Sequence, residues 1–324
     1  MTHRPLPPRP AAVVDRTTCR LWLRWSLASV ALAGAALWLA TPRIVHAAPA
    51  PTVIEAVQLP AWVERHGQRR PAQPGIALRN SDKAVTAAQA RMLLRLPDRS
   101  EVKLGEATEL VIEDMSIVRP GVAQPQQINS SLRLVTGVFR YATDLASKLA
   151  GDTRRLDLKL ATATVGIRGT DFWSMTDAEH DAVCVFEGKV AVQRDIQPEI
   201  DLEKPGAFWV TYTGQPEKPA GQATPDQLVK FIGQAELSPG SGVLIQGGRW
   251  RAVLGLLPNA ARASDLRETL ATQGYPAEVM PKDGKFEVRI NQFATEQDAR
   301  AVVQRLSSQT DLKLKDARVA LSAN

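Results

Sequence analysis

The residues that could carry chemistry are few and scattered along this chain of 324 residues. Its four histidines are His3, His46, His66 and His180, and none lies three or four residues from another, the spacing that would place two metal ligands on one helix face. Motifs for a nucleophilic serine, a phosphate-binding loop or a dinucleotide-binding turn are absent from the sequence. We therefore expect a protein that is not an enzyme and that uses neither a metal nor another cofactor.

The two cysteines, Cys19 and Cys184, are far apart in the sequence. Cys184 alternates with Val183 and Val185 in a run typical of a strand, which favours a small buried residue. A reactive thiol is the alternative interpretation. An acidic run, Asp177, Glu179 and Asp181, favours a solvated hairpin tip, with a cation-binding edge as its alternative.

Charge is concentrated at the N-terminus. The first 47 residues hold six arginines and one aspartate, which is +5 of the formal net charge of +6. The remaining +1 provides no long-range field to attract a polyanion, so we expect no nucleic-acid partner.

The same region has the pattern of an export signal. Residues 25–40 are uncharged and mostly apolar, five arginines precede them, and Val45-His46-Ala47 resembles a signal-peptidase site. This predicts a signal peptide over residues 1–47, with an uncleaved N-terminal anchor as the alternative. In both cases residues 48–324 are expected on the periplasmic side.

Beyond the signal, the sequence changes character three times. Five prolines suggest an extended lead-in over residues 48–74. Alternation such as Leu156, Leu158 and Leu160 predicts half-buried strands and an all-β domain over residues 75–215. Prolines and glycines then indicate a linker over residues 216–247, with one short helix that begins at a Thr224–Gln227 capping box.

Residues 248–324 predict a small α+β domain with the order β-α-β-β-α-β. The expected strands cover residues 250–257, 277–280, 286–290 and 313–319, and the helices cover residues 260–273 and the stretch after Thr295. This order suits an antiparallel sheet with both helices on one face. Strand alternation then places five residues on or beside the open face: Arg251, Val253, Arg289, Asn291 and Gln292.

One segment of the β domain resembles the FecR domain. Residues 163–172 form an alternating strand ending in Arg-Gly-Thr-Asp-Phe, and residues 184–192 continue with Glu-Gly-Lys-Val. The resemblance implies a β-rich, solenoid- or sandwich-like interaction domain. Its glycines are expected in tight turns, with Arg168 held by Asp171 or Glu187 in a structural role; contact with a ligand is the alternative. The motif residues are Arg168, Gly169, Thr170, Asp171, Phe172, Glu187 and Gly188.

The C-terminal region resembles the SPOR domain. Matching positions are Gly255, Leu257, Asn259, Ala263, Leu266, Phe286, Val288, Arg289, Phe293, Ala299 and Leu306. The resemblance implies binding to peptidoglycan glycan strands stripped of their stem peptides, and it makes the five open-face residues candidates for glycan contact. Val253 stands where the family often has Gln, and Asn291-Gln292 where it has Gly-Pro.

Together these patterns predict a multidomain periplasmic scaffold or binding protein. Its partners would be peptidoglycan, through the C-terminal domain, and an unidentified envelope protein, through the β domain. The alternative is an envelope signalling regulator of the FecR type that lacks the cytoplasmic sigma-binding domain, since only about 20 residues precede the apolar segment.

Overall fold

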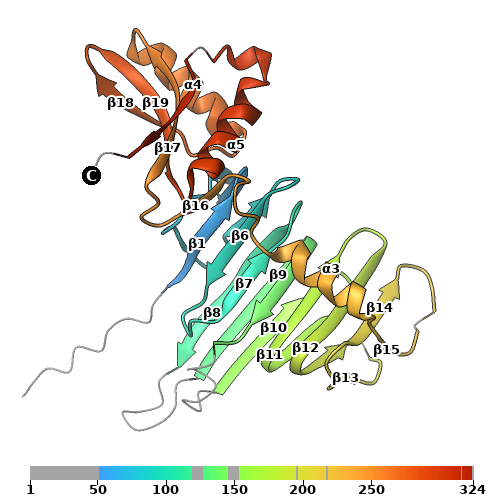
Figure 1. Ribbon diagram of the computed structural model, residues 1–324. Coiled ribbons are helices and arrows are strands. Elements are labelled where there is room, and N and C mark those ends of the chain that lie inside the picture. The colour runs from blue at the N-terminus through green and yellow to red at the C-terminus, as the bar shows by residue number, and fades with distance from the viewer. Residues whose placement is uncertain are drawn as a thin grey trace, which may run out of the picture. The chain divides into compact units, whose positions relative to one another are not determined.

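The computed structural model describes residues 51–118, 127–144, 153–194, 196–216, 218–314 and 316–322 (Figure 1). The apolar segment at residues 25–40 and the cleavage motif that ends at Ala47 lie outside these ranges, so the signal peptide stays a prediction. Among the described residues, no helix is both long enough and apolar enough to cross a membrane.

Strands β1 to β15 form the β domain. Their bounds are β1 Thr52–Gln58, β2 Ala61–Arg65, β3 Gln68–Pro71, β4 Ala77–Leu78, β5 Lys83–Thr86, β6 Arg91–Arg95, β7 Glu101–Leu104, β8 Glu109–Val118, β9 Gln127–Ala142, β10 Thr153–Lys159, β11 Thr164–Thr176, β12 His180–Gln193, β13 Ile200–Leu202, β14 Ala207–Tyr212 and β15 Gly221–Gln222. The expected alternation is present: Leu156, Leu158 and Leu160 are buried, whereas Arg155 and Lys159 are exposed.

The long strand β9 organises this domain. Its first half pairs with β8 and, in parallel, with β10, and its second half pairs with β7 and β11. Gly137 lies between the halves with a φ of 96°. A Cβ at this position would lie 2.5 Å from the Cα of Thr108, so only glycine fits where β9 changes partners.

The β domain begins earlier than the sequence pattern predicts. Strands β1, β2 and β3 fall inside the expected lead-in at residues 48–74, β1 pairs with β6, and Ile54 and Val57 are fully buried. The prolines of this stretch do not interrupt the strands: Pro60 lies between β1 and β2, and Pro71 is the last residue of β3. Proline at a strand end leaves the hydrogen-bonded ladder intact, which explains the difference.

The expected linker at residues 216–247 is also more ordered than its composition suggests. Helix α3, Pro225–Ala235, begins at the predicted capping box, in which the Thr224 hydroxyl and the Gln227 amide each accept from the other residue's backbone N–H. The helix lies against the β domain (Figure 1), and Phe231 stacks on Trp173 with ring centroids 4.1 Å apart.

The last ordered element of this stretch is β16, Val243–Ile245. It pairs antiparallel with β1 of the β domain, and its central residue Leu244 also pairs with Phe293 in the C-terminal domain. The residues before it are fixed by a buried carboxylate, because Asp298 accepts hydrogen bonds from the backbone N–H groups of Gly240, Gly242 and Val243 at 2.8 to 3.0 Å. Residues 216–247 therefore connect the two domains as ordered structure that pairs with both of them.

The C-terminal domain has the order of elements expected from the sequence. Its elements are β17 Trp250–Leu257, α4 Ala260–Thr272, β18 Glu278–Lys282, β19 Lys285–Phe293, α5 Glu296–Ser307, the 3-10 helix η1 Thr310–Leu312 and β20 Arg318–Leu321. The sheet runs β18-β19-β17-β20, and each neighbouring pair is antiparallel. The N-caps of its helices are Asn259 and Thr295, and each side chain accepts from the backbone N–H three residues later.

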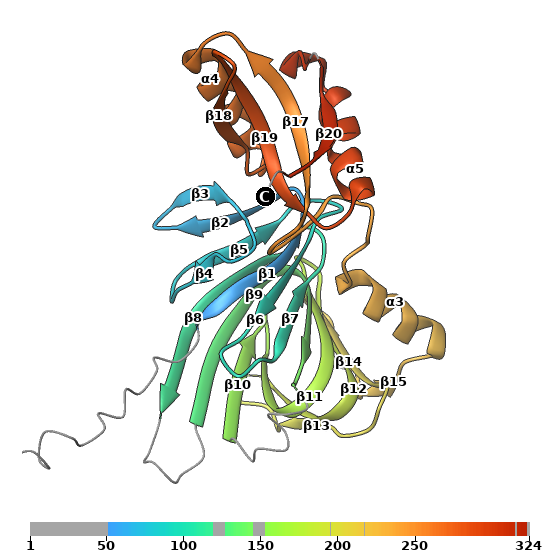
Figure 2. The same ribbon diagram turned by 60° about the vertical axis from the view of Figure 1, so that its left-hand side comes forward.

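Both helices of this domain pack on one side of its sheet (Figure 2). The core between them is apolar and comprises Ala252, Leu254, Ala263, Leu270, Val288, Ile290, Phe293, Ala299, Val302 and Leu306. Among the described residues, no helix packs on the opposite face of the sheet. Polar strand residues therefore remain available there for a ligand.

Candidate functional site

The helix-free face of the C-terminal sheet holds a hollow of about 480 Å³. Most of its lining comes from β17, β18, β19 and the residues next to them, while one residue comes from the turn that follows β3. The lining residues are Gln73, Leu244, Gly248, Arg251, Pro276, Glu278, Arg289, Asn291, Gln292 and Ser322.

Strand alternation brings the predicted side chains to this hollow. Ala252 and Leu254 enter the core, so Arg251 and Val253 of β17 face the other side, and Val253 pairs in register with Arg289 of β19. Four of the five residues predicted for this face line the hollow: Arg251, Arg289, Asn291 and Gln292. Val253 does not, because it is only 1% exposed, and the expectation that it contacts a ligand needs correction.

A buried carboxylate lies beside the arginines. By strand alternation Glu287 of β19 points to the same face as Arg289, and it is only 2% exposed. Its oxygens lie 3.1 Å from Lys282 Nζ, 3.6 Å from Arg289 Nη1 and 3.9 Å from Arg318 Nη2. Burial raises the pKa of Glu287, but the hydrogen bond from Lys282 and the surrounding cations outweigh that effect and hold the pKa below its ordinary value.

Several polar atoms in the lining have no partner. The Nε atoms of Arg251 and Arg289 and the Oγ of Ser322 are buried, and no hydrogen-bond acceptor or donor for them lies among the described residues. Asn291, by contrast, donates from Nδ2 to Glu278 at 2.7 Å. The charges of the lining are two arginines and one glutamate, so the hollow favours a polar ligand with an anionic group.

The rim of the hollow depends on one close backbone approach. Gln292 has a φ of 67°, in the left-handed region. Gly248 lies against it, and a Cβ at residue 248 would fall 2.2 Å from the Gln292 carbonyl oxygen. No local sequence pattern marks this approach or the participation of Gln73, because both depend on segments that are distant in the chain.

The FecR-like motif forms a β-bulge inside a long hairpin rather than the expected tight turns. Gly169 lies within β11 and Gly188 within β12, and the register of the two strands shifts between Arg168 and Asp171. Before the bulge β11 pairs with β10, and after it β11 pairs with β9. Strands commonly change sheet neighbours at such bulges.

Among the described side chains, the partner of Asp171 is Arg140 of β9, which donates two hydrogen bonds to it at 3.0 and 2.7 Å. The side chain of Arg168 lies outside the described residues, so its expected contact with Asp171 or Glu187 stays a prediction. Phe172 is fully buried beside Phe139 and Tyr141. The motif residues Asp171 and Phe172 thus hold the strand in place after the bulge, a structural role.

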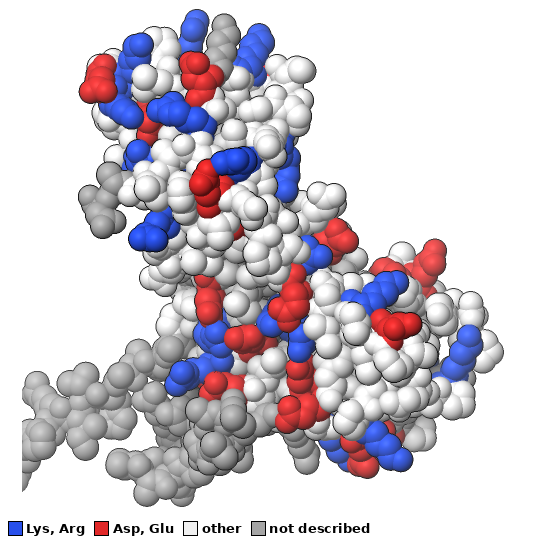
Figure 3. All heavy atoms as spheres, viewed as in Figure 1, with Lys and Arg blue, Asp and Glu red and all other residues white. Residues whose placement is uncertain are grey.

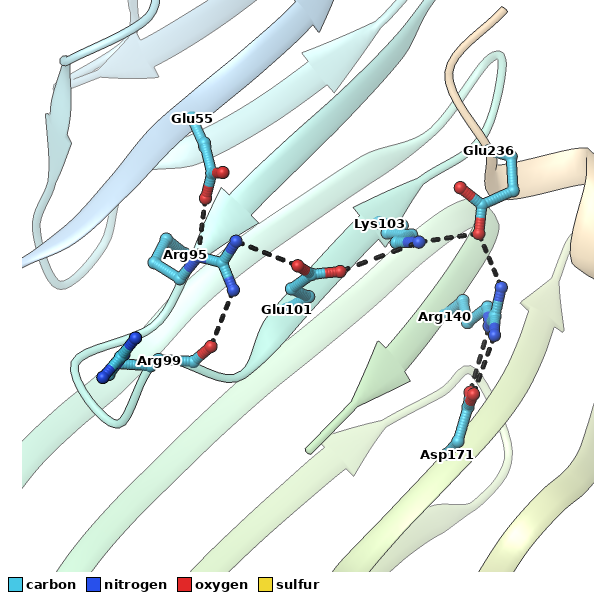
Figure 4. A network of polar contacts seen from close by, with 8 residues as sticks. All are labelled: Glu55, Arg95, Arg99, Glu101, Lys103, Arg140, Asp171 and Glu236. Carbon is cyan, nitrogen blue, oxygen red and sulfur yellow. Dashed lines mark hydrogen bonds and ion pairs between the residues drawn. The ribbon is translucent and has the colours of Figure 1, made fainter. Parts of the chain in front are cut away.

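Arg140 also belongs to a larger ionic network on this sheet (Figure 4). Its Nη1 and the Nζ of Lys103 each lie 2.6 Å from the same oxygen of Glu236, the residue that ends α3. The network continues across β7, β6 and β1, and its members are Glu55, Arg95, Glu101, Lys103, Arg140, Asp171 and Glu236. In the space-filling view, acidic and basic side chains are intermixed in this region (Figure 3). The network fixes the end of α3 to the sheet.

The remaining chemical candidates are structural. Cys184 is fully buried, and burial raises the pKa of its thiol to about 12, so the thiol stays protonated and unreactive. Asp177 accepts from the backbone N–H groups of Glu179 and His180 in the hairpin turn. Asp181 is buried instead of solvated and accepts two hydrogen bonds from Thr162. Among the described residues, no group of three acidic, histidine or cysteine side chains could hold a metal ion.

Comparison with protein families accounts for both domains. The family described as FecR protein matches residues 82–191, and the family described as SPOR domain matches residues 246–313. The chain therefore carries a FecR domain followed by a C-terminal SPOR domain.

Two crystal structures are similar over a longer span. Both are of a "putative anti-sigma factor" from Parabacteroides distasonis ATCC 8503, with 14% sequence identity and a TM-score of 0.36. The similarity covers 75% of this chain and 98% or 99% of the other chains. A likeness of this degree carries no argument about function. No curated protein matches the chain.

Proposed function

We propose that this protein is a non-enzymatic, periplasmic scaffold or binding protein of the cell envelope. Its SPOR domain binds peptidoglycan glycan strands, and its FecR domain contacts another envelope protein. One observation carries the glycan proposal: four polar residues predicted for the helix-free sheet face, Arg251, Arg289, Asn291 and Gln292, converge on one hollow.

The chemistry of the hollow suits a sugar chain. Glycans present many hydroxyl and amide groups, which need planar donors and acceptors at fixed positions, and guanidinium and carboxamide groups supply them. Asn291, Gln292 and the two arginines provide donors, while the Glu278 carboxylate provides an acceptor. Leu244 and Pro276 add apolar surface against which a sugar ring can pack. Since SPOR domains bind peptidoglycan, this face is the expected contact.

Sedimentation with purified sacculi tests the proposal. The full chain is expected to pellet with peptidoglycan, and more strongly after an amidase has removed the stem peptides. The double variant Arg251→Gln/Arg289→Gln should remain largely in the supernatant. Arg262→Gln/Arg267→Gln removes the same two charges from exposed positions on α4 and should sediment like the parent chain. Sedimentation no better than that of an unrelated protein, on both kinds of sacculi, would contradict the proposal.

The FecR domain favours a second candidate, an envelope signalling regulator of the FecR type. The two candidates differ in the expected fate of residues 1–47. A scaffold that is released into the periplasm begins near Ala48, whereas a regulator that contacts a membrane partner keeps the apolar segment as an anchor. N-terminal sequencing of the protein from fractionated cells distinguishes them, because an intact N-terminus in the membrane fraction supports the regulator.

A further inference from the structure

The strands of the β domain that lie under α3 are apolar on both faces. In β11, β12 and β14, the side chains of Phe172, Val185 and Trp209 belong to the main core, whereas their neighbours form a second apolar cluster with α3. The larger side chains that the sheet contributes to this second cluster are Trp173, Met175, Phe186, Phe208 and Val210. The outer face of an antiparallel sheet is usually polar where water covers it, so this face is built to be covered.

Helix α3 covers this face incompletely. Phe231 is buried and stacks on Phe208, with ring centroids 5.7 Å apart, in addition to its contact with Trp173. The sheet side chains that nevertheless remain half-buried are Met175, Phe186, Phe208 and Val210. The apolar face is therefore larger than the helix that lies on it.

Among the described residues, three cations of the sheet contact the C-terminal end of α3. Arg91 of β6 donates from Nε to the Gln234 carbonyl at 3.2 Å. Lys103 of β7 and Arg140 of β9 each lie 2.6 Å from the Glu236 carboxylate (Figure 4). The last carbonyls of a helix lack intrahelical partners and form the negative end of its dipole, so cations at this position favour a bound helix. The three cations therefore fix the direction in which a helix lies on the face.

Two features make α3 a weakly held occupant. Gly233 lies inside the helix at an exposed position, and no atom lies within 4 Å of where its Cβ would stand, so it lowers the helix propensity without a packing reason. In addition, the Nε1 of Trp173 and the Oε1 of Gln234 are buried, and neither has a hydrogen-bond partner among the described residues. A helix that offers an acceptor to the indole N–H would fit the face better than α3 does.

We infer that this face of the FecR domain is the docking site for an amphipathic helix of another envelope protein, which displaces α3. The partner helix carries apolar side chains at positions i, i+3, i+4 and i+7, followed by a carboxylate that takes the place of Glu236. The corresponding apolar residues of α3 are Leu228, Phe231, Ile232 and Ala235. The inference deepens the proposed function and rests on it, because it names the surface through which the FecR domain contacts its partner.

A labelled peptide with the sequence of residues 222–237 is the probe, and fluorescence anisotropy measures its binding to the full chain. In the parent chain α3 competes with the peptide, so the apparent affinity scales with the fraction of chains whose face is free. Phe231→Ala removes the main apolar contact of α3 and should tighten peptide binding by about tenfold or more. Gly233→Ala strengthens α3 and should weaken the binding. Val229→Ala is the matched control, because Val229 is 72% exposed, and it should bind like the parent chain.

Further variants assign the binding to the face. Lys103→Gln in the Phe231→Ala chain should lose most of the gain, and a peptide that carries Glu236→Gln should bind more weakly than the original peptide. Leu228→Ala is a milder way to loosen α3 and guards against a folding defect in Phe231→Ala, which circular dichroism would detect. If neither Phe231→Ala nor Leu228→Ala binds the peptide more tightly than Val229→Ala does, the inference is wrong.

Crosslinking in cells tests the kind of occupant. A photoreactive amino acid at the position of Val210 should form a crosslink to a different envelope protein, with a yield that rises in Phe231→Ala and falls in Gly233→Ala. No crosslink, or a crosslink to a second copy of this chain only, would overturn the inference. Sedimentation with sacculi is the separate test of the proposed function: Phe231→Ala should sediment like the parent chain, and a parent chain that does not sediment contradicts the proposed function whatever this face binds.

Discussion

Gly169 illustrates how one residue sets the course of a strand. Its φ of 65° lies in the left-handed region, which is costly for a residue with a side chain, although no atom lies within 4 Å of where a Cβ would stand. Glycine is therefore required at residue 169 for its backbone conformation, and not because a side chain would clash with a neighbour. It occurs at the bulge where β11 changes from β10 to β9.

The first prediction follows from that conformation. Gly169→Val should lower the free energy of unfolding by about 1–3 kcal/mol, the cost of a non-glycine residue in a sparsely populated backbone region. Gly166→Val is the matched control, because Gly166 lies in the same strand without a positive φ and its nearest neighbour atom is 3.9 Å from the added Cβ. Chemical denaturation measures both, and an unfolding midpoint unchanged in Gly169→Val would show that the bulge tolerates a side chain.

At the scale of elements, Asp298 connects α5 to the segment before β16. Its buried carboxylate accepts from three backbone N–H groups, of Gly240, Gly242 and Val243, and from the Thr295 hydroxyl at 2.6 Å. Without it, three backbone donors would be left without their acceptor. A single side chain thus holds together the helix cap and the interdomain segment.

Asp298→Ala is therefore expected to destabilise the protein by at least about 2 kcal/mol, since each unsatisfied buried donor costs about 1–3 kcal/mol. Asp265→Ala, at an exposed position of α4, should change stability by no more than about 0.5 kcal/mol. Thermal unfolding of the two variants gives the comparison. Equal midpoints would mean that residues 240–243 are held by other contacts.

These elements also show what the sequence could predict. The caps at Thr224 and Thr295, the order of the C-terminal elements and the open-face position of Arg251 and Arg289 follow from local rules of capping and alternation, and the structure contains them. Other features depend on pairing between distant segments. The sheet positions of β1 and β16 fall in this second group, as do the Arg140–Asp171 pair and the burial of Glu287, and no local pattern marks them.

At the scale of the whole molecule, carboxyl groups make the stability of the fold depend on pH. In the part of the chain that the structure describes, five carboxyl groups have pKa values held below the ordinary range: Glu64, Asp82, Glu113, Asp177 and Glu287. At Glu113, hydrogen bonds from Lys159, Arg133 and Ser131 lower the pKa from 4.5 to about 2.

A depressed pKa in the folded state means that the unfolded chain takes up protons first as the pH falls. Stability is then fully present above about pH 4.5 and is lost progressively as the pH falls toward 2. Denaturation at pH values from 7 to 3 should show this decline, and Glu113→Gln should make it shallower. Glu199→Gln, at an exposed position, should leave the slope as it is in the parent chain. A stability that does not change between pH 5 and pH 3 would contradict the prediction.

The short strand β16 has a mechanical consequence. It is only three residues long, yet its backbone pairs with β1 on one side and, at Leu244, with β19 on the other. Arg305 of α5 adds a hydrogen bond to the Leu59 carbonyl at 2.8 Å. If the SPOR domain grips the wall while the FecR domain holds a partner, tension between them passes through these bonds. Such a hydrogen-bonded connection between the domains transmits force directly. A bound partner would therefore move with the peptidoglycan, whereas a flexible linker would let it diffuse.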